Sequence, residues 1–245
     1  MLVAIHQPEY LPWLGYFEKM LRADVFVLLD NVQFSKGDFH NRTRIKGSAG
    51  VQWLSIPVHG SISAKINELR VAGHKWEMKH WHSLVSCYSR APFFENLKDV
   101  FEGFYRQSSE RLLDYDLRAL ELMAGVLGIE KNWVLASDLN AGGKKSDLVL
   151  NICRELGATT YYSGRSGSTY LRKDDFDRAG IKIEVQNVAH PVYPQLFGEF
   201  APSLSVLDLL FNCGPAASRD LIRDAALDRV STGSGSDLVR DQHAI

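Results

Sequence analysis

The hydrophobic and polar positions of the chain follow two alternating periods. Near the N-terminus, two short apolar runs, LVAI (residues 2–5) and ADVFVLLD (residues 23–30), flank a segment whose apolar residues recur every three or four positions. Short runs rich in β-branched residues predict buried strands, and the three-to-four spacing predicts a helix. Because a strand–helix–strand crossover is right-handed, the two strands are predicted to be parallel.

A long polar segment, NVQFSKGDFHNRTRIKGSAG, follows the second of these strands and is predicted to be a functional loop. The run VQWLSIPV then alternates enough to predict a third strand. From residue 74 to about residue 128 the spacing becomes helical, as in FENLKDVFEGFYRQ and SERLLDYDLRALELMAGVLG. Ser109 is expected to cap the last of these helices and Gly128 to end it.

Strand and helix patterns alternate again after residue 128. WVLAS, TTYYSG and IKIEVQNV predict strands, and KSDLVLNICRELG predicts a helix that Gly157 closes. SVLDLLFNCG and PAASRDLIRDAALDRV predict two final helices, with Pro215 in the first turn of the second.

This alternation predicts an α/β fold with a mostly parallel, doubly wound sheet, a helical insertion and C-terminal helices. We expect a single domain over residues 1–230, with the insertion at about 74–128. Residues 231–245 lack periodicity and are expected to form a flexible tail.

Charge and cysteine content narrow the possible partners. The 28 Lys and Arg residues balance 29 Asp and Glu residues, so no global field favours nucleic acid or an anionic membrane. The three cysteines show no zinc-type spacing and are expected to be buried free thiols. No signal peptide pattern is present, and no run approaches the ~20 apolar residues that span a bilayer, so we expect a cytoplasmic protein.

The stretch HQPEYLPW, residues 6–13, connects the end of the first predicted strand to the first predicted helix. Ligands of open parallel sheets bind beyond the carboxyl ends of the strands, and a helix N-terminus favours an anion. We therefore expect the two prolines to stiffen the floor of a ligand pocket, with His6, Gln7 and Tyr10 facing it. The alternative is that the turn only fastens the helix to the sheet.

Several ordered blocks resemble one family. AIHQPEYLPWLGYFEKM, ADVFVLLDNVQF, NRTRIKG, WLSIPV, TTYYSGRSGSTYL and LSVLDLLFNCG are together similar to the WbqC-like protein family, from residue 2 to about residue 214. The resemblance implies a bacterial protein of surface-polysaccharide biosynthesis, especially of O-antigen. It implies no established catalytic residue.

A more distant similarity links the chain to the nucleotidylyltransferase superfamily, which includes pantothenate synthetase. PEYLPW, residues 8–13, stands where that superfamily has P-x-H-x-G-H, and ADVFVLLDNVQF and SGRSGSTYL are also similar in order and spacing. Tyr10 and Trp13 stand at the histidine places and Pro12 at the glycine place. They supply no positive charge and no glycine for close phosphate approach, so ordinary nucleotidyl transfer is in doubt.

Two polar segments are candidates for anion binding. Asn41, Arg42, Arg44 and Lys46 lie in NRTRIKG, where cations suit phosphate or carboxylate; the alternative is a solvated basic loop. The turn YYSGRSGSTYL offers glycines and hydroxyl groups for an anion nest, and its candidate residues are Ser163, Gly164 and Ser168. A tight turn without a ligand is the alternative.

Two carboxylates could complete the site. Asp30 ends the second strand and could act with His6 as a base and its orienting group, or simply cap the strand. Asp208 could approach from the last helices or serve in ordinary helix-end hydrogen bonding. The histidines of HKWEMKHWH lack metal spacing, so no metal site is expected.

Together these features lead to the hypothesis of an acyl or aminoacyl transferase that modifies a nucleotide-linked amino sugar. His6 and Asp30 are its candidate catalytic residues, and the substrate is a phosphate-bearing small molecule. No cofactor is firmly implied; ATP with Mg²⁺ or a donor on an acyl carrier protein would fit. The alternatives are a nucleotidyltransferase or adenylate-forming ligase, and a non-catalytic scaffold of polysaccharide assembly.

Overall fold

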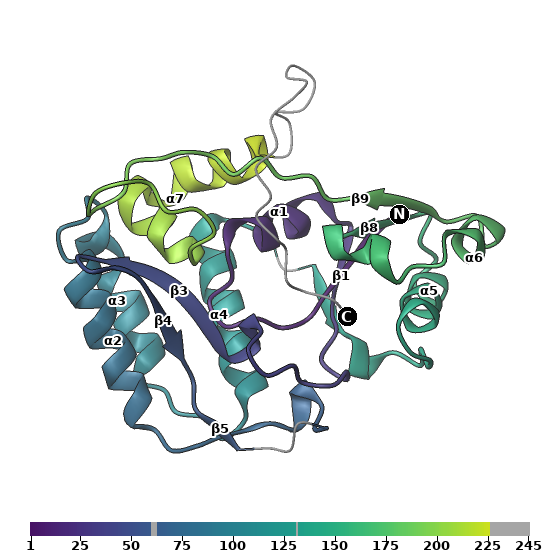
Figure 1. Cartoon of the computed structure of the whole chain (residues 1–245), viewed down its shortest axis with the longest axis horizontal. Coiled ribbons are helices and arrows are strands. Elements are labelled where there is room, and N and C mark those ends of the chain that lie inside the picture. The colour runs from purple at the N-terminus through teal and green to yellow at the C-terminus, as the bar shows by residue number, and fades with distance from the viewer. Residues whose placement is uncertain (60–62, 131, 226–245) are drawn as a thin grey trace.

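A computed structural model of the chain describes residues 1–59, 63–130 and 132–225. Its central sheet has five parallel strands in the order β7-β2-β1-β8-β9 (Figure 1). The strands are β1 (Leu2–His6), β2 (Val25–Leu28), β7 (Trp133–Leu135), β8 (Thr160–Ser163) and β9 (Lys182–Val185). The α/β fold with a parallel sheet, expected from the sequence, is confirmed, whereas its likeness to nucleotidylyltransferases stays a prediction.

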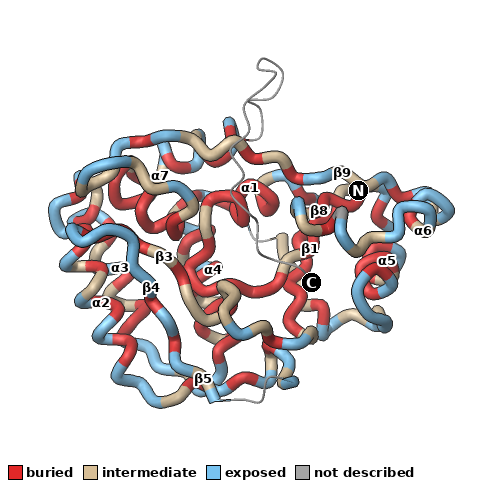
Figure 2. The backbone as a smooth tube through the Cα atoms, viewed as in Figure 1, coloured by how far each residue is buried: buried red, intermediate tan, exposed pale blue. Residues whose placement is uncertain are grey.

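Helices cover both faces of the sheet, and the strand alternation decides which side chain meets which helix. Ala4 and Phe26 join the apolar cluster that contains residues of α1 (Leu14–Arg22) and α7 (Val206–Asp224). Val3, Ile5 and Val27 pack instead with α5 (Ser146–Glu155) and α6 (Lys173–Arg178). Both faces of β1 are therefore buried, as its continuous apolar run requires (Figure 2).

The helical part forms a second layer at the other end of the molecule. It consists of α2 (Lys75–Tyr88), α3 (Phe94–Tyr105) and α4 (Leu112–Leu127), and it lies beyond α1 in Figure 1. Gly128 ends α4 in the left-handed region, at φ 64°, as expected. The expected cap at Ser109 is wrong, because α4 begins at Leu112 and the Ser109 N–H instead donates to the Tyr115 hydroxyl at 2.8 Å.

The polar segment that the sequence predicted as a loop contains a strand. β3 (Arg42–Gly47) pairs antiparallel with β4 (Gly50–Ser55), and this hairpin is separate from the parallel sheet. A second short pair joins β5 (Val58–His59) to β6 (Arg70–Val71). In β3 every second side chain is buried, as at Thr43 and Ile45, but the basic residues between them made the segment resemble a polar loop.

The two predicted C-terminal helices form as α7, which ends at Asp224; residues 226–230 of the second predicted helix lie outside the described residues. Gly214, at φ 78°, interrupts α7 just before Pro215, and a Cβ at Gly214 would lie 2.7 Å from the Phe93 ring. The expected flexible tail, residues 231–245, lies outside the described residues. Within the described residues no helix has the length and apolar character needed to cross a membrane.

Candidate functional site

The turn between β1 and α1, residues 7–13, lies at the carboxyl edge of the parallel sheet. In the sheet, β1 lies between β2 and β8. The chain continues from β1 to β2 on one side, and β8 and β9 extend the sheet on the other side, so the strand order reverses between β1 and β8. This divergence is where ligands of doubly wound folds bind. Ala4 pairs with Tyr162 of β8, which brings Gly164 level with His6.

The turn is held rigidly by the segment that leads into β3. The Tyr10 N–H donates to the Phe39 carbonyl at 3.0 Å, and the Thr43 hydroxyl donates to the Leu11 carbonyl at 2.9 Å. The Val206 N–H donates to the Pro12 carbonyl at 2.9 Å. Leu11 has a positive φ of 49°, a strained conformation that is typical of functional sites.

His6 is oriented by its neighbours in this turn. Its Nδ1 atom lies 3.1 Å from the Gln7 carbonyl and 3.6 Å from Glu9 Oε1. Because a carbonyl only accepts hydrogen bonds, Nδ1 carries the proton and Nε2 is the basic atom of the ring. The Tyr16 ring packs edge-on against the imidazole at 4.7 Å, and the Tyr16 hydroxyl also donates to the Gln7 carbonyl.

Sequence reasoning missed the carboxylates beneath this turn. The Glu9 side chain is 2% exposed, and Asp116 of α4 is also 2% exposed. Neither carboxyl oxygen of Asp116 has a hydrogen-bond partner among the described residues, and burial followed by the Glu9 charge raises its pKa well above the usual range. Asp116 lies on the buried face of α4 with Leu112, Ala119 and Leu120, so a polar residue in an apolar stripe was the available signal.

Asp30 has the contacts of a structural carboxylate. It is 1% exposed, its Oδ1 accepts from the Ser137 N–H at 2.9 Å, and its Oδ2 accepts from the Asn67 amide at 3.0 Å. These bonds tie the end of β2 to the segment after β7 and to the short helix that contains Asn67. Strand-end capping accounts for this geometry, and a catalytic role for Asp30 stays a prediction.

Tyr10 points away from the sheet edge and into the helical layer. It is fully buried, and its hydroxyl lies 3.0 Å from His80 Nδ1 and 2.8 Å from the Tyr105 hydroxyl. Burial lowers the pKa of His80 to about 4, so the imidazole is neutral near pH 7. In this structure Tyr10 has no surface for a ligand, whereas Gln7 contributes its carbonyl to the orientation of His6.

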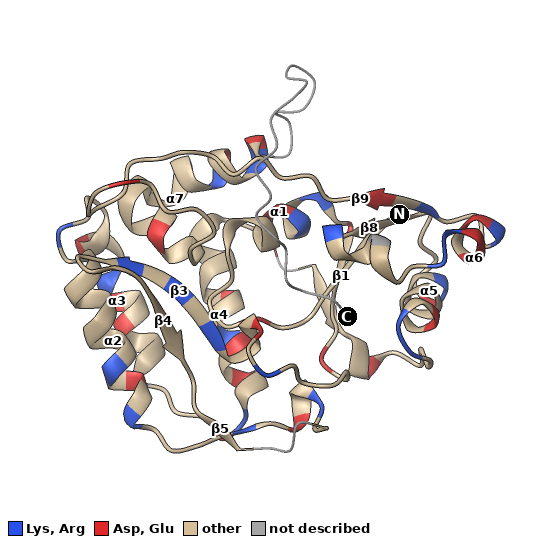
Figure 3. Cartoon of the chain, in the orientation of Figure 1, with Lys and Arg blue, Asp and Glu red and all other residues tan. Residues whose placement is uncertain are grey.

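The predicted basic residues lie along β3 rather than in a loop (Figure 3). Asn41, just before the strand, donates from its amide to the Ile56 carbonyl at 2.8 Å. The Arg42 guanidinium stacks on the Trp53 ring at 4.1 Å, and Arg44 donates to the Ser203 carbonyl at 2.8 Å. Ser203 also has a positive φ, 57°.

The structure brings Lys46 and Asp208 together. The Tyr88 hydroxyl donates to Asp208 Oδ2 at 2.9 Å and accepts from the Lys46 backbone N–H at 3.1 Å. Burial raises the pKa of Asp208, and the Lys46 charge partly offsets this rise. The Lys46 ammonium donates to Gln195 and to the Glu199 carbonyl, which fastens the long connection before α7 to the hairpin.

The turn after β8 is compact. Ser163 is fully buried, and its hydroxyl donates to the Gly164 carbonyl at 3.0 Å. A Cβ at Gly167 would lie 1.8 Å from the Ser163 hydroxyl oxygen, so close packing requires that glycine. The Ser168 side chain lies outside the described part of the structure.

No cluster of three or more His, Cys, Asp or Glu side chains within residues 1–59, 63–130 and 132–225 could hold a metal ion. The predicted site residues lie in two places in the structure. His6, Gln7 and Gly164 lie at the sheet edge, and Arg42, Arg44, Lys46 and Asp208 lie on or against the hairpin. The segment of residues 39–43 connects the groups through its hydrogen bonds to the turn.

Comparison with known proteins gives a consistent picture. The model of a family described as the WbqC-like protein family matches residues 7–220. Over 219 residues the chain is 35% identical to the uncharacterized protein Rv1507c of Mycobacterium tuberculosis (strain ATCC 25618 / H37Rv), which covers 88% of this chain and 95% of the relative. No solved structure matches the chain.

Proposed function

The chain belongs to the WbqC-like protein family, and from this premise we propose that it is an acyl or aminoacyl transferase acting on a nucleotide-linked amino sugar. The observation that supports this best is the oriented histidine at the edge of the sheet. His6 presents a basic Nε2 atom and has the Glu9 carboxylate 3.6 Å from its Nδ1 atom. This arrangement suits a general base whose protonated form is stabilised by a neighbouring carboxylate.

The proposed reaction joins the sugar amine to an activated acyl group, such as a thioester or an acyl phosphate. The amine lone pair forms the new bond to the acyl carbon while His6 Nε2 takes a proton from the amine nitrogen. The leaving group departs with the electrons of its bond to the acyl carbon and receives that proton from His6. Glu9 lowers the energy of the imidazolium that exists between these steps.

The cations of β3 would hold the phosphates of the sugar carrier, because arginine offers two parallel donors to a phosphate. A role in surface-polysaccharide biosynthesis, including O-antigen, belongs to the proposal and rests on family membership. So does a cytoplasmic location, which the buried thiols of Cys87 and Cys153 favour. The enclosed position of Tyr10 counts against nucleotidyl transfer, since a phosphate-binding side chain must reach the ligand.

Mass spectrometry of the product tests the proposal. The purified protein is incubated with a panel of nucleotide-linked amino sugars and acyl or aminoacyl thioesters, with and without ATP and Mg²⁺. We expect one sugar to gain the mass of the acyl group, and His6→Gln to abolish that gain. His82→Gln is the matched control, because His82 is exposed on α2.

Two results would overturn parts of the proposal. Full activity in His6→Gln would remove His6 from the mechanism. Failure of every sugar to react, with either donor type, would refute acyl transfer.

A further inference from the structure

We infer that the outer face of the β3–β4 hairpin binds a nucleoside phosphate, with Trp53 receiving the base and with Arg42 and Arg44 holding the phosphate. The inference rests on the proposed function only in identifying this nucleotide as the carrier part of the substrate. The binding site itself is argued from the hairpin.

The strand register gathers these side chains on one face. Arg44 of β3 is paired directly with Trp53 of β4. Arg42 lies two residues before Arg44, so its side chain is on the same face of the hairpin. The opposite face is buried in the core through Thr43, Ile45 and Leu54. The basic and aromatic side chains are therefore directed outward together.

Trp53 differs from the tryptophans of the helical layer. It is 44% exposed, whereas Trp76 and Trp81 are 5% and 6% exposed. Phe39 lies beside it, with ring centroids 5.3 Å apart, and widens the apolar surface. Aromatic surface of this kind accepts a nucleobase by stacking, without requiring a particular base.

The arginines beside Trp53 have no acidic partner among the described residues. Neither Arg42 nor Arg44 forms an ion pair within the part of the chain that the structure describes. The Arg44 Nε atom is buried without a hydrogen-bond acceptor there, and burial lowers the pKa of Arg44. Two cations without an acidic partner are stabilised when an anion binds beside them.

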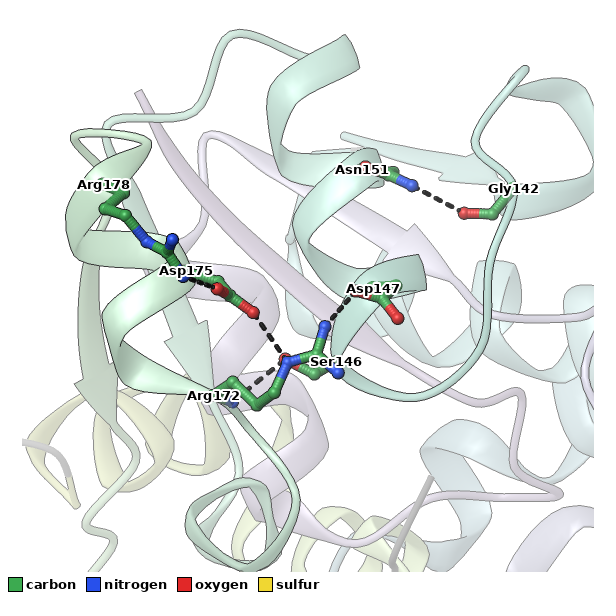
Figure 4. A network of polar contacts seen from close by, with 7 residues as sticks. All are labelled: Gly142, Ser146, Asp147, Asn151, Arg172, Asp175 and Arg178. Atoms are coloured by element: carbon green, nitrogen blue, oxygen red, sulfur yellow. Dashed lines mark hydrogen bonds and ion pairs between the residues drawn. The ribbon is translucent and has the colours of Figure 1, made fainter.

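Other arginines of the chain show the contrast. Arg22 stacks on Tyr162 at 4.2 Å, as Arg42 does on Trp53, yet it is neutralised by Glu184 at 3.1 Å. At the end of the sheet, Arg172 and Arg178 are both bound by Asp175, and Arg172 also by Asp147 (Figure 4). Arg22, Arg172 and Arg178 thus have their own counter-ions, whereas Arg42 and Arg44 have no acidic partner among the described residues.

A nucleoside phosphate fits this face better than other anions. It combines a flat apolar ring with a phosphate, as the face combines an indole with guanidinium groups. Long nucleic acid is disfavoured, because the chain carries a net charge of −1 and this row of cations is short.

Calorimetric titration of the intact protein tests the site. The ligands are UMP and AMP, with uridine and inorganic phosphate as half-ligands, at low and moderate salt. We expect both nucleotides to bind more tightly than either half-ligand. Trp53→Leu should raise the Kd of UMP about 5- to 150-fold, the range expected for one base–aromatic stack, while Trp53→Phe retains most of the affinity.

Arg42→Ala should weaken both UMP and inorganic phosphate, because it removes a phosphate contact. Arg22→Ala is the matched control and should leave both Kd values unchanged. Circular dichroism of each variant checks that the hairpin is folded.

The outcomes separate this inference from the proposed function. Nucleotide binding that is unchanged in folded Trp53→Leu and Arg42→Ala would overturn the hairpin site and leave the transferase proposal standing. Absence of binding by any nucleotide would overturn the hairpin site together with the proposed substrate class.

Discussion

Asp116 should make the stability of the protein depend on pH in a direction opposite to that of most carboxylates. Its pKa is raised in the folded state by burial and by Glu9, so the unfolded chain loses the Asp116 proton at lower pH than the folded chain does. The stabilising contribution is complete below the unfolded pKa of about 3.9 and is lost as the pH rises toward the folded pKa.

The size of the effect follows from the difference between the Asp116 pKa values of the folded and unfolded states. Between the two pKa values, the loss is about 1.4 kcal/mol for each pH unit. The perturbation is Asp116→Asn, which keeps the shape of the side chain but cannot ionise. Its free energy of unfolding, relative to that of the unaltered protein, should therefore rise by about 1.4 kcal/mol for each unit above about pH 4, until the folded pKa is reached.

The assay is urea unfolding of both proteins at intervals from pH 4 to pH 8, followed by circular dichroism. For a chain of this size, each kcal/mol corresponds to roughly 2–4 °C in Tm, so thermal melts give a second reading. Asp99→Asn is the control, because Asp99 is exposed on α3 and should show no such trend. A difference between Asp116→Asn and the unaltered protein that stays constant from pH 4 to pH 8 would refute the argument.

Three further substitutions test the packing around the site, each by urea unfolding at pH 7. Asp30→Ala should cost about 1–3 kcal/mol, because it leaves two donors without their acceptor; a cost near zero would contradict the capping role. Gly214→Ala should cost at least about 1 kcal/mol, because the residue has φ 78° and no room for a Cβ, whereas Gly142→Ala, which meets open space, should be near neutral. Tyr10→Phe should cost about 1–2 kcal/mol through the lost hydrogen bonds to His80 and Tyr105, and an unchanged midpoint would show that these buried contacts contribute nothing.

The periodicity of the sequence was sufficient to predict the strands of the parallel sheet and the long helices. The apolar runs at β1 and β2 are buried on both faces, as a parallel strand covered by helices requires, and Gly128 ends α4 because it adopts a positive φ that other residues avoid. These features depend on local conformation and on which side of an element meets water. Local conformation and exposure to water both determine which residue types occur at adjacent positions, so these features can be inferred without the tertiary structure.

Only some residues of the candidate site could be predicted from the spacing of apolar residues. His6 could be placed at a strand end, and its position at the edge of the sheet follows from the strand–helix–strand pattern. The enclosure of Tyr10 could not be foreseen, because its partner His80 lies 70 residues along the chain. The basic residues of β3 resembled a loop, since their charges obscured the alternation of the strand.

The sequence by itself thus determined the strands of the parallel sheet, the long helices and the strand end that carries His6, because each follows from the local spacing of apolar residues. Only the tertiary structure decided that Trp53 lies opposite Arg44, and that the Asp116 carboxyl group lies near Glu9 and has no hydrogen-bond partner among the described residues. Those contacts depend on hairpin register and on the packing of α4 beneath the first turn. Such long-range packing is fixed by the sum of many weak contacts, and no short stretch of the sequence contains it.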